Sequence, residues 1–358
     1  MSYLKDFCEI ITKGTTPSTY GYSFKNSGIK FIRSENITDS RIISKVSLYI
    51  SKEANEKLKR SILLKDDVLM SIAGAYLGKL ALITEMDLPA NTNQAVAIIR
   101  TDKSKLNPLY LYYYLSSYKM QCYINNVNAQ SAQPNINLQQ IGDININVPS
   151  LNYQQHIVDT VGSLDDKIEN NNKIIIKLEE LLNLKFKNIY NDALKTGITI
   201  NLNDIVNLKT GKKDANAANE NGIYPFFTCS EKESNIDVYS FNQEAILIAG
   251  NGNMSVKYFN GKFDAYQRTY VISSSKYFYY LYLYYKNFIG NISVGAKGSV
   301  IKFLTKSMLL DIDLPILDNI TMQRFESDIQ KILNYELRLS EENKKLNLLK
   351  EKYLKRFF

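Results

Sequence analysis

The stretch VLMSIAGAYLGK at residues 68–79 ends in a glycine–lysine pair, a combination that can bind phosphate. A phosphate-binding P-loop has a glycine, four further residues and then Gly-Lys-Ser/Thr, because its backbone amides wrap the phosphates and its hydroxyl ligates magnesium. Here Ala73 occupies the first glycine position and Leu80 the hydroxyl position, so both chemical requirements fail. The residues therefore favour a strand followed by a turn over a nucleotide site.

The tetrapeptide NPLY at 107–110 is close to the Asn-Pro-Pro-Tyr with which adenine-N6 methyltransferases hold a flipped base. Leu109 replaces the second proline, and no glycine-rich cofactor motif precedes the tetrapeptide. Asn107 and Pro108 are typical of a helix start, with asparagine as the N-cap and proline at the first helical position. We therefore expect a helix here and no catalysis.

The chain contains an internal repeat, in which residues 68–100 align with residues 245–273. In each copy a β-rich run leads through a turn around Ala-Gly to a second run and then a third. The third run follows Asn93-Gln94 in one copy and Tyr266-Gln267 in the other. The second glycine turn, at 250–253, has no lysine, so a phosphate loop is not kept in both copies. A tyrosine-rich segment, a small-polar loop, a proline-containing segment and a long helical pattern complete each copy.

Few ionisable side chains could form a catalytic set. His156 is the only histidine, so neither a Ser/His/Asp relay nor a histidine metal cluster can be built once in each repeat. The adjacent aspartates at 66–67 and at 165–166 point to different faces, which favours turn and helix-start roles over acid–base catalysis. We expect no catalytic residue and no metal site in this chain.

The composition is that of an ordinary soluble globular protein, with 358 residues, 45% apolar and 22% charged. This length has room for two or three domains. No apolar run reaches the roughly 18 residues of a membrane span, and the N-terminal residues lack a signal-peptide pattern. The odd, scattered cysteines (Cys8, Cys122 and Cys229) suit free thiols, so we expect a cytoplasmic protein. A net charge of +8 permits a nucleic-acid partner without requiring one.

Each repeat ends in a helical pattern of roughly 36–40 residues, or about 55–60 Å of helix. Apolar residues follow a heptad spacing in both patterns. A single antiparallel register pairs apolar residues in five layers and one asparagine with another. It places Val161, Ile168, Asn171, Ile175, Leu182 and Ile189 opposite Tyr353, Leu346, Asn343, Leu339, Ile332 and Phe325. This predicts an intramolecular antiparallel coiled coil; the alternative is two independent amphipathic helices on domain cores.

These patterns predict an α/β (α+β) chain of two pseudo-symmetric β-rich modules and two long helices. We expect one module at 1–150, a central helix at 151–195, a second module at 196–320 and a C-terminal helix at 321–358. Two modules held a fixed distance apart could contact one duplex at two sites about a helical turn or more apart.

The motif order resembles the specificity subunit of type I restriction–modification systems over essentially the whole chain. The resemblance is carried by ILLKDDVLMSIAGAYLGK, NTNQAV, NPLYLYYYL, AQSAQPNI and VPSLNYQQHIVDTVGSLDDKIENN. The second copy is less typical, because LPILDNITMQRF lengthens the proline-to-glutamine spacing by two residues. No single motif is decisive, but their order, repeated twice, is specific.

The resemblance implies two target-recognition domains with curved β-sheets, each of which reads one half of a split double-stranded DNA sequence. The helices would fix the spacing of the halves and dock two methyltransferase subunits. Restriction motor–nuclease subunits would complete the complex. S-adenosylmethionine, ATP and magnesium would belong to these partners, so no cofactor is implied in this chain.

DNA phosphates are contacted by Lys, Arg, hydroxyl groups and loop amides, and base edges by Arg, Asn, Gln or Lys. The polar loops of the first module supply Lys13, Thr15, Thr16, Tyr20, Arg33, Ser34, Asn36, Tyr76, Lys79, Gln130, Gln133 and Asn135. Those of the second supply Lys212, Lys213, Thr228, Ser230, Asn251, Asn253, Lys257, Gln267, Arg268 and Lys297. Each of these residues could instead be a solvated loop residue that does not contact DNA. We expect the tyrosine runs to form helix and core rather than base-stacking platforms.

Two other functions remain open from the sequence. The chain could be a self-contained DNA methyltransferase or restriction enzyme, or a scaffold of a multi-subunit complex that does not contact DNA.

Overall fold

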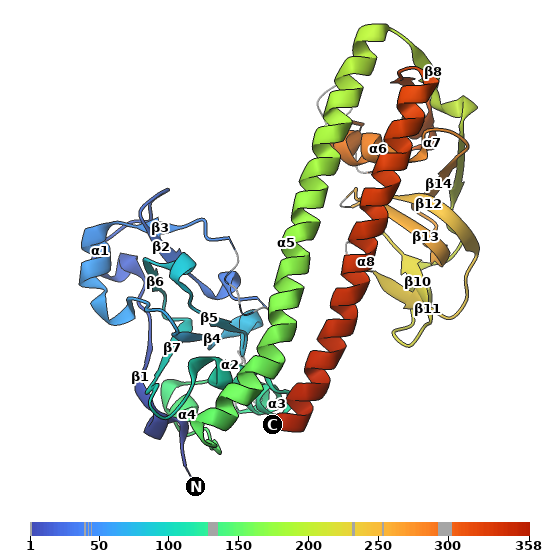
Figure 1. The fold of residues 1–358 in the computed structure, drawn as a ribbon. Coiled ribbons are helices and arrows are strands. Elements are labelled where there is room, and N and C mark those ends of the chain that lie inside the picture. The colour runs from blue at the N-terminus through green and yellow to red at the C-terminus, as the bar shows by residue number, and fades with distance from the viewer. Residues whose placement is uncertain are drawn as a thin grey trace. The chain divides into compact units, whose positions relative to one another are not determined.

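The computed structural model describes residues 2–38, 41, 43, 45–127, 135–230, 233–252, 254–292 and 303–358 (Figure 1). The chain divides into two compact units, of which unit 1 comprises Met1–Asn170 and Glu342–Phe358, and unit 2 comprises Asn171–Glu341. We call the part of unit 1 before residue 151 the first head. The part of unit 2 between residues 197 and 318 is the second head.

The strands of the first head are β1 (Cys8–Lys13), β2 (Ile29–Ile32), β3 (Tyr49–Ile50), β4 (Val68–Ser71), β5 (Leu80–Leu82), β6 (Ala90–Thr92) and β7 (Val96–Thr101). One sheet has the order β1-β7-β4-β5, in which all neighbours are antiparallel. A second sheet has the order β3-β2-β6, in which β2 pairs antiparallel with β3 and parallel with β6.

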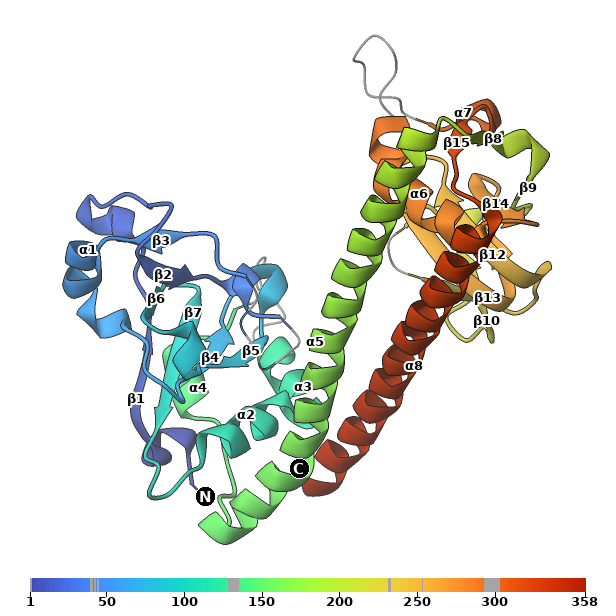
Figure 2. The same cartoon turned by 45° about the horizontal axis from the view of Figure 1, so that its top comes forward.

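The strands of the second head are β8 (Thr199–Asn201), β9 (Val206–Thr210), β10 (Tyr224–Phe227), β11 (Ser234–Ile236), β12 (Phe241–Ala249), β13 (Val256–Ala265), β14 (Thr269–Ser274) and β15 (Asp313–Pro315). The main sheet has the order β11-β10-β13-β12-β14-β9. Figure 2 shows its strands from β10 to β9. A small sheet pairs β15 with β8.

The two heads share one strand plan. In each, β1 or β9 pairs with β7 or β14, which in turn pairs with β4 or β12, and all of these pairs are antiparallel. In the second head β13 pairs antiparallel with β12 and, at its end, parallel with β10. In the first head two strands share the role of β13. β5 pairs antiparallel with β4, and β6 pairs parallel with β2, because an irregular segment at 83–89 separates β5 from β6. The internal repeat inferred from the sequence is therefore a repeat of strand pairing.

The stretch at 68–79, for which a strand and a turn were predicted, forms part of a hairpin. β4 and β5 pair antiparallel, and the Gly78 amide donates to the Ser71 carbonyl oxygen at 2.9 Å. The residues between them include a 3-10 turn at Gly74–Tyr76. The expectation of a strand and a turn is confirmed.

The shorter helices are α1 (Lys52–Lys57), α2 (Pro108–Ser116), α3 (Tyr118–Asn126) and α4 (Leu138–Gly142) in the first head, and α6 (Phe278–Ile292) and α7 (Lys306–Leu310) in the second. The Asn107 side chain caps α2 by accepting from the Leu109 and Tyr110 amides, and Pro108 occupies the first turn. The prediction of a helix start at Asn107 is confirmed.

The tyrosine-rich helices α2 and α6 belong to the main core of each head. Tyr113, Tyr280 and Tyr285 are fully buried, and each hydroxyl has an acceptor. These acceptors are the Asp165 carboxylate at 2.8 Å, the Pro315 carbonyl at 2.8 Å and the Leu309 carbonyl at 2.5 Å. A buried phenol needs such a partner, so the tyrosine runs are core, as predicted.

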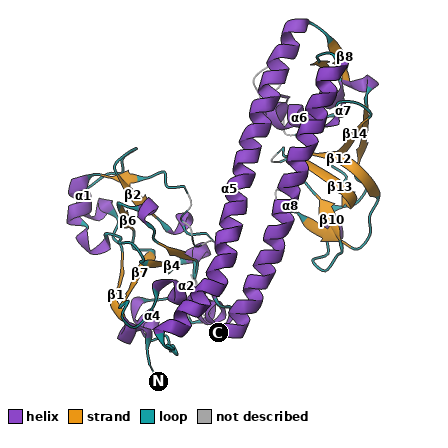
Figure 3. Ribbon diagram, in the orientation of Figure 1, coloured by secondary structure: helices purple, strands orange, loops and turns teal. Residues whose placement is uncertain are grey.

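Two long helices, α5 (Leu151–Thr196, 46 residues) and α8 (Asn319–Phe357, 39 residues), each contribute one segment to unit 1 and another to unit 2 (Figure 3). In unit 1, Lys350 contacts Asp165 at 2.6 Å and Glu342 contacts Lys167 at 3.5 Å, which gives the segments opposite directions. In unit 2, Lys185 contacts Asp328 at 3.0 Å.

The side chains of the predicted helical register are buried or partly buried. Val161 and Leu182, at 0% and 1% exposed, lie in the two main cores, together with partly buried Tyr353 and Ile332. Asn171 and Asn343 are also buried but belong to different units, so their pairing stays a prediction.

Candidate nucleic-acid interface

In the second head the predicted polar side chains gather at one edge of the main sheet. At this edge β9 and β12 end and β14 begins, as the pairs Thr210↔Tyr270 and Ala249↔Thr269 show. The loops that leave these strand ends carry the candidates Lys212, Lys213, Asn251, Gln267 and Arg268. One structural edge therefore unites candidates from three separate stretches of sequence.

Backbone hydrogen bonds hold these loops together. The Gln267 amide donates to the Lys213 carbonyl at 2.9 Å, and the Gly250 amide donates to the Arg268 carbonyl at 2.8 Å. The Leu304 amide in turn donates to the Gly250 carbonyl at 2.8 Å. Because the backbone polar groups are satisfied internally, the exposed side chains of Gln267 and Arg268 project from a defined frame.

A shallow hollow of about 360 Å³ lies at this edge. Its lining residues are Thr210, Gly250, Gln267, Arg268, Tyr270, Phe303 and Leu304. One guanidinium and one carboxamide at the rim are the groups that bind base edges bidentately.

The neighbouring loop at 228–230 adds two further candidates to this edge. The Lys257 ammonium donates to the Ser230 carbonyl at 3.0 Å and lies 5.9 Å from the centre of the Phe227 ring. The Cys229 thiol lies 3.6 Å from the Arg268 carbonyl oxygen. Thr228 accepts from the Ser230 amide at 3.2 Å, so its hydroxyl oxygen also supports the loop.

The corresponding edge of the first head holds Lys13, Thr15 and Thr16, where β1 ends. The Thr15 amide donates to the Thr92 carbonyl at 3.2 Å, and the Thr16 hydroxyl donates to the Gln94 side chain. Asn135 forms a bridge with Ala73 after β4. Arg33 and Ser34 follow β2, whose end pairs in parallel with the end of β6.

Two first-head candidates, Asn36 and Arg33, have internal contacts. Asn36 is only 8% exposed, and its amide accepts from the Arg33 backbone at 2.8 Å and donates to the Lys45 carbonyl at 3.2 Å. We therefore leave Asn36 out of the proposed DNA surface. The Arg33 guanidinium is paired with Glu35.

Two aromatic candidates, Tyr20 and Tyr76, are exposed and lie under lysine side chains. The Lys57 ammonium is 5.6 Å from the Tyr20 ring centre, and the Lys79 ammonium is 5.5 Å from the Tyr76 ring centre. Lys79 also lines a hollow of about 250 Å³ beside Lys350 and other residues of α8, so it faces the long helix. Gln130, Gln133, Asn253 and Lys297 lie outside the described residues.

Gln94, which was not among the predicted residues, is exposed and occupies the place in the first head that Gln267 occupies in the second. The repeat alignment contained the necessary signal, because it pairs Asn93-Gln94 with Tyr266-Gln267.

A buried polar cluster, which was also not predicted, links the first head to the long helices. Asp165 lies well inside α5, not at a helix start as predicted, and accepts from the Tyr113 hydroxyl at 2.8 Å and Lys350 at 2.6 Å. Burial, followed by the neighbouring Asp165 charge, raises the pKa of Tyr113. Arg41 reaches the same helix, through Glu169 at 2.6 Å and through Asp166.

In unit 2 a carboxylate of α8 supports α6. Glu326 accepts from the Tyr279 and Tyr280 amides at 3.0 and 2.7 Å, next to the helix N-terminus, where a negative charge is stabilised. Burial nevertheless raises the pKa of Glu326. About two turns further along α6, Lys286 lies 3.4 Å from Glu179 of α5.

Within the part of the chain that the structure describes, no group of three or more His, Cys, Asp or Glu side chains could hold a metal ion. Among the same residues, every helix is too short or too polar to cross a bilayer. The three cysteines are free and partly buried.

The sequence matches the family described as "Type I restriction modification DNA specificity domain" over residues 1–180 and 198–350. It is 42% identical over 122 residues to the type I restriction enzyme EcoDI specificity subunit of Escherichia coli. That match covers 33% of this chain and 27% of the E. coli subunit, so it spans little more than a quarter of that relative.

A longer match is with the type I restriction enzyme MjaIX specificity subunit of Methanocaldococcus jannaschii. The two are 25% identical over 383 aligned positions, which cover 92% of this chain and 87% of the relative. Among solved structures, the type I restriction–modification system S subunit from M. genitalium aligns with a TM-score of 0.67 and 16% identity. The alignment covers 100% of this chain and 95% of that one, which shows that the fold is shared.

Proposed function

The chain belongs to the type I restriction–modification DNA specificity domain family, and on that basis we propose that it is the DNA sequence-specificity subunit of such a complex. Each target-recognition domain binds one half of a bipartite duplex target. We place these domains at residues 1–150 and 196–320. Spacer helices at 151–195 and 321–358 fix the distance between the two half-sites.

The single observation that carries this proposal is the duplicated strand plan with a polar edge in each head. Lysine, arginine, hydroxyl and carboxamide groups gather at equivalent strand ends, and these are the groups that contact DNA phosphates and base edges. In the second head Lys212, Lys257 and Arg268 supply positive charge at this edge, and in the first head Lys13 does so. Two heads with the same strand plan and a polar edge each suit a DNA target with two halves.

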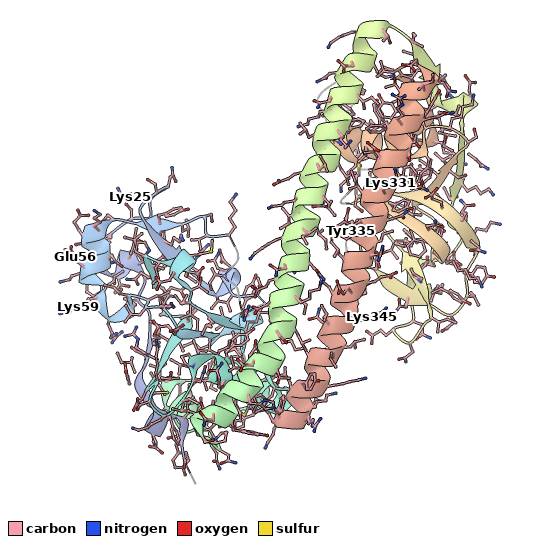
Figure 4. All side chains as sticks on the ribbon, viewed as in Figure 1. Lys25, Glu56, Lys59, Lys331, Tyr335 and Lys345 are labelled. Carbon is pink, nitrogen blue, oxygen red and sulfur yellow. The ribbon has the colours of Figure 1, made fainter. Side chains whose placement is uncertain are left out.

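The long helices are the proposed docking surface for two methyltransferase subunits. Ile176 and Leu184 of α5 are 56% and 57% exposed, and Leu348 of α8 is 60% exposed. Tyr335 is also exposed on α8, four residues after Lys331 (Figure 4). Exposed apolar side chains on helices that otherwise carry charged residues are what a protein partner would bury.

The reactions themselves belong to partner subunits. S-adenosylmethionine binds to the methyltransferases, and ATP and magnesium support the restriction motor–nuclease subunits. This chain contributes binding energy, base selection and spacing. The alternatives, a self-contained DNA enzyme and a scaffold that does not contact DNA, make different biochemical predictions.

Equilibrium binding of the partner-loaded complex to DNA separates these functions. We expect affinity for one bipartite duplex that exceeds affinity for a scrambled duplex and that falls steeply as salt increases, because phosphate contacts release counterions. The isolated chain incubated with S-adenosylmethionine, ATP, magnesium and DNA should show no turnover. Turnover by the isolated chain would support the self-contained enzyme, and equal binding to scrambled DNA would remove the specificity role.

A further inference from the structure

A four-residue turn occurs at the same place in both heads, between β6 and β7 and between β13 and β14. In the first head the Val96 amide donates to the Asn93 carbonyl at 3.2 Å. In the second head the Thr269 amide donates to the Tyr266 carbonyl at 2.7 Å. Each turn therefore spans four residues, 93–96 or 266–269, at the polar edge described above.

In each head the glycine that directly follows β1 or β9 packs against this turn. A Cβ added to Gly14 would lie 2.0 Å from the Thr92 carbonyl oxygen, and one added to Gly211 would lie 1.9 Å from the Ala265 carbonyl oxygen. The Gly14 amide donates to the Val96 carbonyl at 3.3 Å, and the Gly211 amide donates to the Thr269 carbonyl at 3.2 Å. Only glycine allows this approach of two backbones.

The residue two positions before each turn and the third residue of the turn are fixed in the same way in both heads. Asn91 and Asp264 are fully buried, and each side-chain oxygen accepts from the next backbone amide at 2.8 Å. The third residue of each turn, Ala95 or Arg268, accepts a backbone hydrogen bond from the residue after β4 or β12, at 2.9 and 2.8 Å. The two turns thus have one construction.

The side chains that these turns present differ, with one exception. Asn93 is replaced by Tyr266 and Ala95 by Arg268, whereas the second residue is glutamine in both heads, Gln94 and Gln267. Both glutamines are exposed. The second position of a four-residue turn accepts most residue types, so the backbone does not require glutamine. A ligand group common to both heads accounts for the shared residue.

We infer that Gln94 and Gln267 each read an adenine at the corresponding position of the two half-sites. A glutamine carboxamide donates to adenine N7 and accepts from the adenine N6 amino group, a bidentate pair that the major groove offers at A·T pairs. The inference rests on the proposed function and assigns one shared base contact to two otherwise different domains. Arg268 adds a guanine-reading group beside Gln267, where the first head has only Ala95.

In the first head a neighbour orients the carboxamide. The Thr16 hydroxyl donates to the Gln94 side-chain oxygen, which retains a second lone pair for the adenine N6 amino group. The Gln94 amide nitrogen remains the donor toward N7. Thr16 is therefore a positioning residue, and Gln94 is the residue that contacts the base.

The test compares DNA methylation in cells that carry the whole system with wild-type, Gln94→Ala or Gln267→Ala chains. Gln139→Ala, at an exposed glutamine of α4 away from the turn, is the matched control. We expect Q94A to relax one A·T position in one half-site and Q267A to relax one A·T position in the other. Q139A should keep the wild-type motif.

A binding experiment with the purified complex locates the contact. Replacing the selected adenine by 7-deazaadenine, which lacks the N7 acceptor, should weaken binding of the wild-type complex roughly 5- to 150-fold. The same replacement should leave the matching glutamine variant unaffected. Gln94→Met and Gln267→Met, which keep side-chain length, should behave as the alanine variants do.

The outcomes separate the two proposals. If the wild-type system methylates no bipartite motif, the proposed function fails, whatever the glutamines do. If it does, unchanged motifs in both glutamine variants overturn the inference. Relaxation at a G·C pair, or uniform weakening across all sequences in both the alanine and methionine variants, also overturns it, because either result removes adenine recognition.

Discussion

The Lys350 ammonium of α8 lies 2.6 Å from the Asp165 carboxylate of α5, and both side chains are almost buried, at 15% and 9% exposed. The same carboxylate accepts from the Tyr113 hydroxyl of α2 at 2.8 Å. One buried carboxylate thus joins both long helices to the tyrosine-rich helix of the first head. This junction holds the first head on the helix segments of unit 1.

Lys350→Met should destabilise the protein by about 3 kcal/mol, because it leaves the buried Asp165 charge without its partner. Adding Asp165→Asn should recover much of this loss, since the double variant has no buried charge at the site. Chemical denaturation measures both effects. Lys195→Met, which breaks the exposed Lys195–Asp192 pair, is the control and should change stability by less than about 0.5 kcal/mol. Equal effects of K350M and K195M would contradict this assignment.

Gly14→Ala and Gly211→Ala should each cost at least about 2 kcal/mol, because a methyl group at either position overlaps a backbone carbonyl. Thermal unfolding provides the measurement. Gly290→Ala is the matched change, since a Cβ there meets nothing within 4 Å and alanine favours helix. Tolerance of alanine at both Gly14 and Gly211 would show that the duplicated turn does not need this close approach.

Glu336→Gln should stabilise the protein at neutral pH. Burial raises the pKa of Glu336, an effect that Lys286 opposes and Glu179 reinforces, and among the described residues one carboxylate oxygen has no hydrogen-bond partner. A carboxyl group whose pKa is raised on folding contributes stability at low pH that is lost as pH rises through the folded-state pKa. The advantage of E336Q in melting temperature should therefore shrink as the pH is lowered toward 4.

Glu341→Gln, at an exposed position of α8, provides the control and should show no such pH-dependent advantage. An E336Q advantage that is the same at pH 4 and pH 8 would mean that removal of a buried charge is not its cause.

Arg268→Ala should reduce affinity by roughly 1–3 kcal/mol at one base position and relax specificity there. Lys212→Ala, at an exposed position of the same edge, should instead weaken binding to all sequences alike. It should also make the slope of log K against log salt concentration shallower by about one. Competition binding over a set of single-base variants measures both. Uniform weakening by R268A would make Arg268 a phosphate contact rather than a base contact.

Much of the fold could be predicted because local or periodic patterns in the sequence indicate it. The heptad spacing indicated α5 and α8, the Asn107-Pro108 pair indicated the start of α2, and the repeat indicated that both heads share one plan. A repeat also excluded the nucleotide site, since Gly250–Gly252 lacks the lysine of the first copy. Such signals need no knowledge of which distant residues meet.

The proposed recognition surface was harder to predict because it depends on distant neighbours. Asn36 has the residue type of a base reader, yet it is buried and its side-chain amide is hydrogen-bonded to the backbone of Arg33 and Lys45. Asp165 has the type of a surface helix residue, yet Tyr113 and Lys350 bury it. Residue type and loop position indicate which side chains could bind DNA, whereas three-dimensional packing decides which remain accessible.

Methylome sequencing of cells with the gene present and with it deleted tests the central claim most directly. If two duplicated heads on paired helices select one split target, deletion should remove adenine methylation at a single motif of two defined halves separated by an undefined spacer. A methylome that is unchanged by the deletion, or the loss of a continuous motif without a spacer, would contradict the account.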